Sequence, residues 1–152
     1  MPLKPGDKAP DLTLPDQHGE PFSLSRSLKS RKVLVYFYPK ANTPGCTAQA
    51  CGLRDALPAL GDTAVVGISP DGPGAQAAFD EKFSLGFPLL SDPDHAVADQ
   101  YGAWGEKRMY GRTYLGIIRS AFLIDEEGII AEAWPKISPK DTPKKLLAAV
   151  AG

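Results

Sequence analysis

The two cysteines, Cys46 and Cys51, are the residues of this 152-residue chain whose type and spacing point most directly to chemistry. Cys46 ends the run YPKANTPGC (residues 38–46), which follows an apolar segment and opens a helical pattern. Thr43 is a suitable N-cap and Pro44 suits the first helical position, so Cys46 falls on the third helical residue. This position makes Cys46 the leading candidate for a reactive thiol.

A cysteine in the first helical turn lies where the thiolate is the favoured form. The helix N-terminus presents unpaired N–H groups and about half a positive charge, and both stabilise an anion. Because the thiolate is the nucleophile, this position predicts redox chemistry at Cys46. The structural alternative is a small buried hydrophobic residue, which is what a free cysteine usually is. Cys46 also begins an apolar stripe on a helix predicted over residues 44–60, and the stripe predicts that it is shielded from water. The stripe consists of Cys46, Ala50, Leu53, Leu57 and Leu60.

The spacing of the two cysteines is incompatible with a disulfide inside an intact helix. Cys46 and Cys51 stand at positions i and i+5, which differ by about 140° around the helix axis and about 7.5 Å along it. Their Cα atoms are then about 8.7 Å apart, whereas a disulfide needs Cα atoms within about 7 Å. A bond between them therefore requires at least one turn to unwind. Gly52 makes unwinding easier, because glycine lowers helix stability by about 1 kcal/mol relative to alanine.

This geometry distinguishes three interpretations of the cysteine pair. A permanent structural disulfide is disfavoured, because the helix would have to be absent. A thioredoxin-style dithiol uses Cys-x-x-Cys, which the chain lacks. A cysteine that is oxidised by a small molecule and then resolved by its neighbour after local unfolding fits the spacing. Two other functions stay open: a redox-switched binding protein that exposes Leu53 and Leu57, and a general thiol–disulfide oxidoreductase.

Composition indicates one globular domain over residues 1–152 and argues against several classes of partner. Hydrophobic residues make up 43% of the chain and charged residues 23%, and the length suffices for a single core. The net charge of −1 gives no electrostatic case for binding nucleic acid or an anionic membrane. We find no apolar stretch typical of a signal peptide or a membrane span. We therefore expect a cytoplasmic protein, in which two cysteines are more often catalytic than joined in a permanent structural disulfide.

Strand and helix patterns alternate along the chain and predict an α/β sandwich around a mixed sheet. An N-terminal hairpin is predicted around the turn signal at residues 16–19. Thr142 is expected to cap a last helix, with Pro143 in its first turn. Residues 103–116 lack periodicity and are expected to form a long loop that is functional or mobile. The other predicted strands cover residues 33–38, 64–68, 88–90, 120–124 and 129–134, and the other helices cover about 75–83 and 95–101.

The spacing Pro39-x-x-x-Thr43-x-x-Cys46 resembles the active-site signature of peroxiredoxins. The wider likeness is to the Q-type branch, also called bacterioferritin comigratory proteins, and it continues in order through nearly the whole chain. One departure is Ala121, where many relatives carry Thr or Ser, and it removes a local hydrogen bond. The similar runs are VYFYPK (35–40), TPGCT (43–47), GISPD (67–71), LLSD (89–92), YGAWG (101–105) and RSAFLID (119–125).

The resemblance implies a thioredoxin-like fold with added elements, and a thiol peroxidase that acts on peroxides without a cofactor. Carried onto this sequence, Cys46 is the peroxidatic cysteine, and Cys51 matches the resolving position of many Q-type members. Thr43 is expected to hydrogen-bond the peroxide and the thiolate, Pro39 to shield the pocket, and Arg119 to support the thiolate and the reacting oxygens. The resemblance also implies a monomer that is reduced by thioredoxin, with glutaredoxin as the alternative.

Without the resemblance, the same residues have ordinary structural interpretations. Arg119 would be a surface residue at a strand start, Thr43 an N-cap, and Pro39 a strand terminator. The roles of Thr43 and Pro39 in the backbone are compatible with roles in catalysis. His18 and His95 have no metal-ligand spacing with the cysteines, so we expect neither a zinc nor a haem site.

Overall fold

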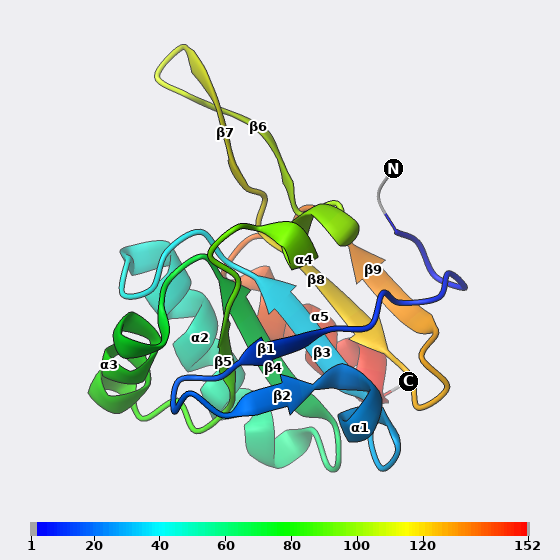
Figure 1. Ribbon diagram of the computed structural model, residues 1–152. Helices are drawn as coiled ribbons and strands as arrows, with labels where there is room; N and C mark the ends of the chain where they lie inside the picture. The colour runs from blue at the N-terminus through cyan, green and yellow to red at the C-terminus, as the bar shows by residue number, and fades with distance from the viewer. Residues whose placement is uncertain (1–2, 152) are drawn as a thin grey trace.

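The centre of the molecule is a five-stranded mixed sheet, seen in a computed structural model that describes residues 3–151 (Figure 1). The strands lie in the order β5-β4-β3-β8-β9. β3, β4 and β5 are parallel, whereas β8 and β9 are each antiparallel to their neighbours. The sequence predicted all five strands to within one residue at each end. Their bounds are β3 Val33–Phe37, β4 Ala64–Ser69, β5 Leu89–Ser91, β8 Ser120–Ile124 and β9 Ile130–Trp134.

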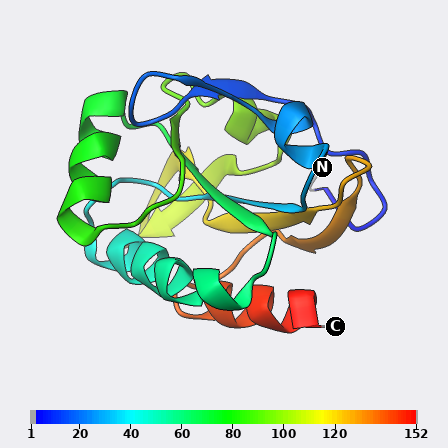
Figure 2. The same ribbon diagram turned by 90° about the horizontal axis from the view of Figure 1, so that it is seen from below.

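Each face of the sheet carries its own apolar core, because successive residues of a strand point to opposite sides. Val35 and Phe37 of β3 face the core that includes α1 and α4, whereas Leu34 and Tyr36 face α2, α3 and α5. Figure 2 shows α2 and α5 side by side beneath the sheet and the N-terminal elements above it. The helices are α1 Leu24–Leu28, α2 Pro44–Ala56, α3 Pro73–Phe83, α4 Ala96–Gln100 and α5 Asp141–Ala151.

The predicted N-terminal hairpin is confirmed. β1 (Thr13–Pro15) pairs antiparallel with β2 (Pro21–Ser23). The buried amide of Gln17, in the turn between them, donates to the Phe87 carbonyl at 3.0 Å and accepts from the Leu89 N–H at 3.0 Å. These bonds attach the hairpin to the edge of the central sheet.

Residues 103–116, which we expected to be an irregular loop, instead form most of a second hairpin. β6 (Trp104–Met109) pairs antiparallel with β7 (Arg112–Ile117). The turn residues Tyr110 and Gly111 both have positive φ, of 54° and 76°, as a type I′ turn requires. The expectation of a loop is therefore wrong.

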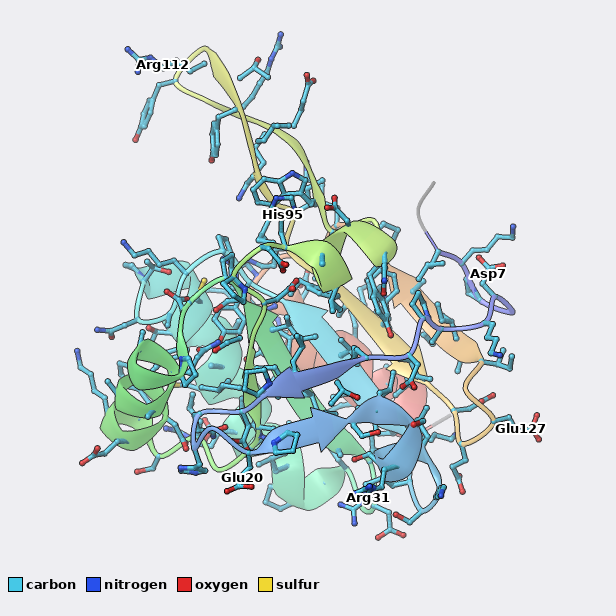
Figure 3. The ribbon with its side chains drawn as sticks, viewed as in Figure 1. Asp7, Glu20, Arg31, His95, Arg112 and Glu127 are labelled. Carbon is cyan, nitrogen blue, oxygen red and sulfur yellow. The ribbon has the colours of Figure 1, made fainter. Side chains whose placement is uncertain are left out.

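The β6–β7 hairpin gives little sequence signal because it projects away from the core (Figure 1). Tyr110 in the turn is 97% exposed and Leu115 of β7 is 62% exposed, so apolar side chains in the outer part of the hairpin face solvent. Figure 3 shows Arg112 at its far end and His95 near its base. There the His95 ring stacks on Trp104, with ring centroids 3.7 Å apart. The hairpin is thus anchored at one end and free at the other.

The helix predicted over residues 44–60 is confirmed in its first three turns and changes type after Ala56. α2 ends there and continues as a 3₁₀ turn over Leu57–Ala59. Pro58 explains the change, because proline has no N–H to continue the α-helical bonding.

The last helix begins one residue before the predicted cap. α5 starts at Asp141, whose backbone N–H donates to Ser138 Oγ at 3.2 Å. The Thr142 hydroxyl instead donates to the Ser138 carbonyl at 2.9 Å. Thr142 is therefore inside the helix and the predicted Thr142 cap is wrong, whereas Pro143 in the first turn is confirmed.

Helices α2 and α5 come closest where α2 carries Gly52. A Cβ atom at Gly52 would lie only 2.9 Å from Cγ of Pro143, which is closer than packed carbon atoms allow. Gly52, expected from the sequence to loosen the helix, thus also permits this close approach. The start of α5 consequently presses against the middle of α2.

We expect Gly52→Ala to destabilise the protein, although alanine favours a helix interior by about 1 kcal/mol over glycine. The added methyl group would overlap the Pro143 ring, and α5 would have to move to relieve the overlap. Urea unfolding measures the change in free energy. Gly74→Ala in α3 is the matched control, because nothing lies within 4 Å of a Cβ atom there. A Gly52→Ala protein as stable as wild type would contradict the close packing of α5 on α2.

Candidate active site

The loop between β3 and α2 is held rigidly at the end of the sheet. The Ala41 N–H donates to the Asp71 carboxylate at 2.7 Å, and the Ser69 hydroxyl donates to the same oxygen at 2.7 Å. Asn42 has a left-handed backbone, with φ of 64°, a conformation that asparagine tolerates. These contacts fix the direction in which α2 leaves the sheet.

Cys46 occupies the third position of α2, as predicted. Its side chain is 1% exposed and packs in the core between α2 and the sheet. Cys51 lies in the same helix, is half-buried, and packs at the edge of that core. Both thiols are free, which agrees with the expectation that an intact helix keeps them apart.

Arg119 reaches the Cys46 sulfur from the neighbouring strand. In the pairing of β3 with β8, Ser120 lies opposite Phe37, so Arg119 stands beside the loop that opens α2. Its Nη2 donates to the Cys46 Sγ at 3.4 Å. Gly45 leaves room for this contact, because a Cβ atom there would lie 3.3 Å from Nη2. A residue remote in sequence thus supplies a positive charge directly at the sulfur.

Gln49 belongs to the same cluster, and the sequence reasoning missed it. Its carbonyl oxygen accepts from Arg119 Nη1 at 2.6 Å, and its amide nitrogen donates to the Thr142 hydroxyl at 2.9 Å. The Gln49 side chain is fully buried. A signal was available, because Gln49 follows Cys46 by three residues and therefore shares its face of the helix. Gln49 thus links the Arg119 guanidinium to the start of α5 through two hydrogen bonds.

Thr43 is the N-cap residue of α2, but its side chain does not cap the helix. The backbone carbonyl of Thr43 accepts from the Thr47 N–H at 2.8 Å. The hydroxyl donates to the Lys40 carbonyl at 2.8 Å. In this arrangement the hydroxyl oxygen keeps its lone pairs for accepting a bond, and it must rotate before it can donate to an oxygen or sulfur.

A cavity of about 710 Å³ adjoins this cluster on the side away from the core. Pro39, just after β3, and Arg119, just before β8, line one side, and Lys107, Arg108 and Thr113 line it from the β6–β7 hairpin. Burial and the nearby Arg119 charge lower the pKa of Lys107, while the charge of Cys46 opposes them. The remaining lining residues are Glu106, Ile118, Lys136 and Ile137. The cavity walls therefore carry four basic side chains and one acidic one.

Most of the chain, including the cysteine–arginine cluster at the start of α2, matches a known protein family. Residues 5–133 match the AhpC/TSA family. The chain belongs to this family and is a peroxiredoxin. The putative peroxiredoxin bcp of Haemophilus influenzae is 55% identical over 143 residues, which cover 92% of this chain and 91% of that protein. Peroxiredoxin Bcp of Escherichia coli is 55% identical over 131 residues, which cover 85% and 83% of the two chains.

Solved structures of peroxiredoxins share the fold. Peroxidoxin BcpB from Mycobacterium tuberculosis matches with a TM-score of 0.87 at 36% identity, covering 98% of this chain and 97% of that one. The bacterioferritin comigratory protein of Xanthomonas campestris, described with alkyl peroxide reduction activity, matches with a TM-score of 0.86 at 32% identity, covering 99% and 96%. The resemblance to the Bcp/PrxQ branch and the thioredoxin-like fold are confirmed. This peroxiredoxin is a thiol peroxidase.

Residues 3–151 contain neither a metal-ligand cluster nor a helix that could span a membrane. Within that range, histidine, cysteine and acidic side chains form no group of three or more that could hold a metal ion. In the same part of the chain, each helix is too short or too polar to cross a bilayer.

Proposed function

We propose that this peroxiredoxin reduces hydrogen peroxide and organic hydroperoxides with Cys46 as the peroxidatic cysteine and Cys51 as the resolving cysteine. The observation that carries the proposal is the 3.4 Å contact between Arg119 Nη2 and a buried sulfur in the first turn of α2. The helix N-terminus and the guanidinium both favour the thiolate. Pro39, in the adjoining cavity wall, shields the reacting atoms, and the Thr43 oxygen is available to the peroxide.

The first step transfers one oxygen atom to Cys46. The thiolate attacks the terminal oxygen of the peroxide, the O–O bond breaks, and Cys46 becomes a sulfenic acid. The peroxide's remaining oxygen leaves as hydroxide or alkoxide and takes up a proton. Negative charge thus moves from the sulfur onto the leaving oxygen, where the Arg119 guanidinium and the Cys46 backbone N–H stabilise it.

A favoured thiolate alone does not make a fast peroxidase. For a thiol whose pKa falls from about 8.5 to about 6, the thiolate fraction at pH 7 rises about 30-fold. Intrinsic nucleophilicity falls with the pKa by about 10- to 18-fold, which leaves a gain of only about two- to threefold. Fixed donors that behave like an oxyanion hole supply about 2.7–4 kcal/mol each. Arg119 therefore contributes mainly by stabilising the transition state.

The second step requires α2 to unwind. Cys51 attacks the sulfenic sulfur of Cys46, water leaves, and a disulfide forms. The two cysteines stand five positions apart in the helix, so the turn between them must open first. Unwinding also breaks the bonds of Gln49 to Arg119 and to Thr142. A slow unwinding step exposes Cys46 to further oxidation to the sulfinic acid.

Thioredoxin is the proposed reductant of the disulfide, with glutaredoxin as the alternative. The protein acts as a monomer of one domain, needs no cofactor, and works in antioxidant defence. Its proposed setting is the cytoplasm, where a disulfide between two otherwise free thiols is transient and catalytic. Peroxide turnover with each dithiol protein and light scattering on the reduced protein test these points.

We expect Arg119→Ala to slow the oxidation of Cys46 by hydrogen peroxide by about 100-fold or more, because it removes a donor to the leaving oxygen. Stopped-flow kinetics give the rate, and ultraviolet absorbance gives the thiolate fraction of the same variant. The fall in rate should exceed the fall in thiolate fraction. Arg31→Ala, at an exposed site far from the sulfur (Figure 3), should match wild type. A rate that falls only in proportion to the thiolate fraction would contradict the role of Arg119.

Cys51→Ser should keep one rapid oxidation of Cys46 and lose turnover driven by thioredoxin, because no disulfide can form within the chain. Consumption of peroxide per protein molecule measures both properties. Cys46→Ser should lose both and serves as the matched control. Sustained thioredoxin-driven turnover by Cys51→Ser would assign the resolving role to another thiol.

Oxidation should open α2 while the sheet stays folded. We expect backbone amides of residues 46–53 to lose protection from hydrogen exchange after one equivalent of peroxide, because the disulfide is incompatible with the helix. Amides of β3 (Val33–Phe37) should keep theirs. Peroxide-treated Cys46→Ser provides the control without the disulfide. Full protection of residues 46–53 in a protein whose disulfide is verified by mass would refute the unwinding step.

A further inference from the structure

Lys107 is directed into the cavity beside the active-site arginine by its neighbours on the hairpin. It pairs with Tyr114 across the two strands, and its Nζ lies 5.9 Å from the Tyr114 ring centroid. A Cβ atom at Gly116 would lie 3.2 Å from Lys107 Cδ, so the aliphatic stem passes directly over this glycine. The stem therefore runs along β7 toward the base of the hairpin, where Arg119 lines the same cavity.

The charges at the site act on Lys107. Its side chain is half-buried although the hairpin projects from the molecule. Burial is the main cause that lowers the pKa of Lys107, and the charge of Arg119 lowers it further. The charge of Cys46 acts in the opposite direction. An acid whose pKa is moved toward the working pH is the more effective proton donor.

The other groups around the cavity are poorly suited to give up a proton. Arginine does not release its proton in proteins, which excludes Arg108 and Arg119 as acids. Glu106 is an acceptor when ionised, and Lys136 is exposed to solvent. The titratable or charged groups that line the cavity with Lys107, contact it or act on it through their charge are Cys46, Glu106, Arg108, Tyr114, Arg119 and Lys136.

We propose that Lys107 is the general acid that protonates the leaving oxygen, an inference that rests on the proposed peroxidase chemistry at Cys46. The thiolate takes the terminal hydroxyl group of the hydroperoxide and becomes the sulfenic acid, and the O–O bond breaks. The Lys107 ammonium gives one proton to the departing alkoxide, which leaves as an alcohol. Lys107 becomes a neutral amine and regains a proton from water that enters the cavity.

The test compares oxidants whose leaving groups differ in their need for a proton. Single oxidations of Cys46 by tert-butyl hydroperoxide and by peracetic acid are followed by stopped flow in wild type, Lys107→Met and Lys107→Arg. An alkoxide is a strong base and needs the acid, whereas acetate leaves without one. With tert-butyl hydroperoxide both variants should be about 100-fold slower than wild type. With peracetic acid both should match wild type, as should the exposed-site control Lys29→Met with either oxidant.

The pH profile gives a second readout. The proton is present below the pKa of Lys107, so the wild-type rate with tert-butyl hydroperoxide should fall as pH rises through that pKa. Both Lys107 variants should lack this fall. With peracetic acid, wild type and both variants should share one pH profile, set by the thiol and by the oxidant's own ionisation, because Lys107 need not give a proton.

Three outcomes would overturn the proposal, and they have different causes. A Lys107→Arg protein as fast as wild type would show that the positive charge acts without proton transfer. Equal slowing of Lys107→Met with both oxidants would show a structural role. A wild-type protein in which no oxidant consumes the Cys46 thiol would refute the proposed function itself, and the assignment of Lys107 with it.

Discussion

The contact between the Arg119 guanidinium and the Cys46 sulfur is the interaction on which the site depends, and the register of the sheet creates it. β8 pairs with β3 so that Ser120 lies opposite Phe37, next to the loop that opens α2. A slip of one residue in this pairing would turn Arg119 to the other face of the sheet. The two apolar cores hold the register, because each needs alternate residues of both strands. Packing remote from the sulfur therefore determines whether the Arg119 guanidinium reaches the Cys46 sulfur.

In the proposed cycle, helix α2 is well packed during the first step and opens in the second. Its bonds from Gln49 to Arg119 and Thr142, and the contact of Gly52 with Pro143, hold it in place while the thiol is reduced. The proposed unwinding would break the same contacts, so the arginine would lose its buried partner only after Cys46 has reacted. Orientation for oxygen transfer and release for disulfide formation thus depend on one set of contacts. Two of these contacts are made by Thr142 and Pro143 at the start of α5, so this segment affects both the packing and the opening of α2.

Features determined by local sequence could be predicted, whereas those determined by remote contacts could not. Thr43 and Pro44 define the start of α2, so the position of Cys46 in its first turn followed from the sequence. Helical spacing placed Gln49 on the same face as Cys46, but its bond to Arg119, 70 residues away, could not be read from local sequence. The β6–β7 hairpin was missed because it forms a separate two-stranded sheet with exposed apolar side chains, and hence no alternating pattern. Its turn, Tyr110-Gly111, also lacks the asparagine or aspartate that usually marks such a hairpin.

The cavity beside the sulfur has two walls that are stabilised independently. Pro39 follows β3 and Arg119 precedes β8, so the register of the sheet and its cores determine where they lie. Lys107, Arg108 and Thr113 belong to the hairpin, which is bonded to itself and anchored by the stacking at its base. Substitutions on the hairpin can therefore alter the second wall without disturbing the register that holds the arginine at the sulfur. In the proposed mechanism the strand register places Arg119 at the sulfur, whereas the hairpin supplies Lys107 and the outer wall of the cavity, so different elements determine these two contributions.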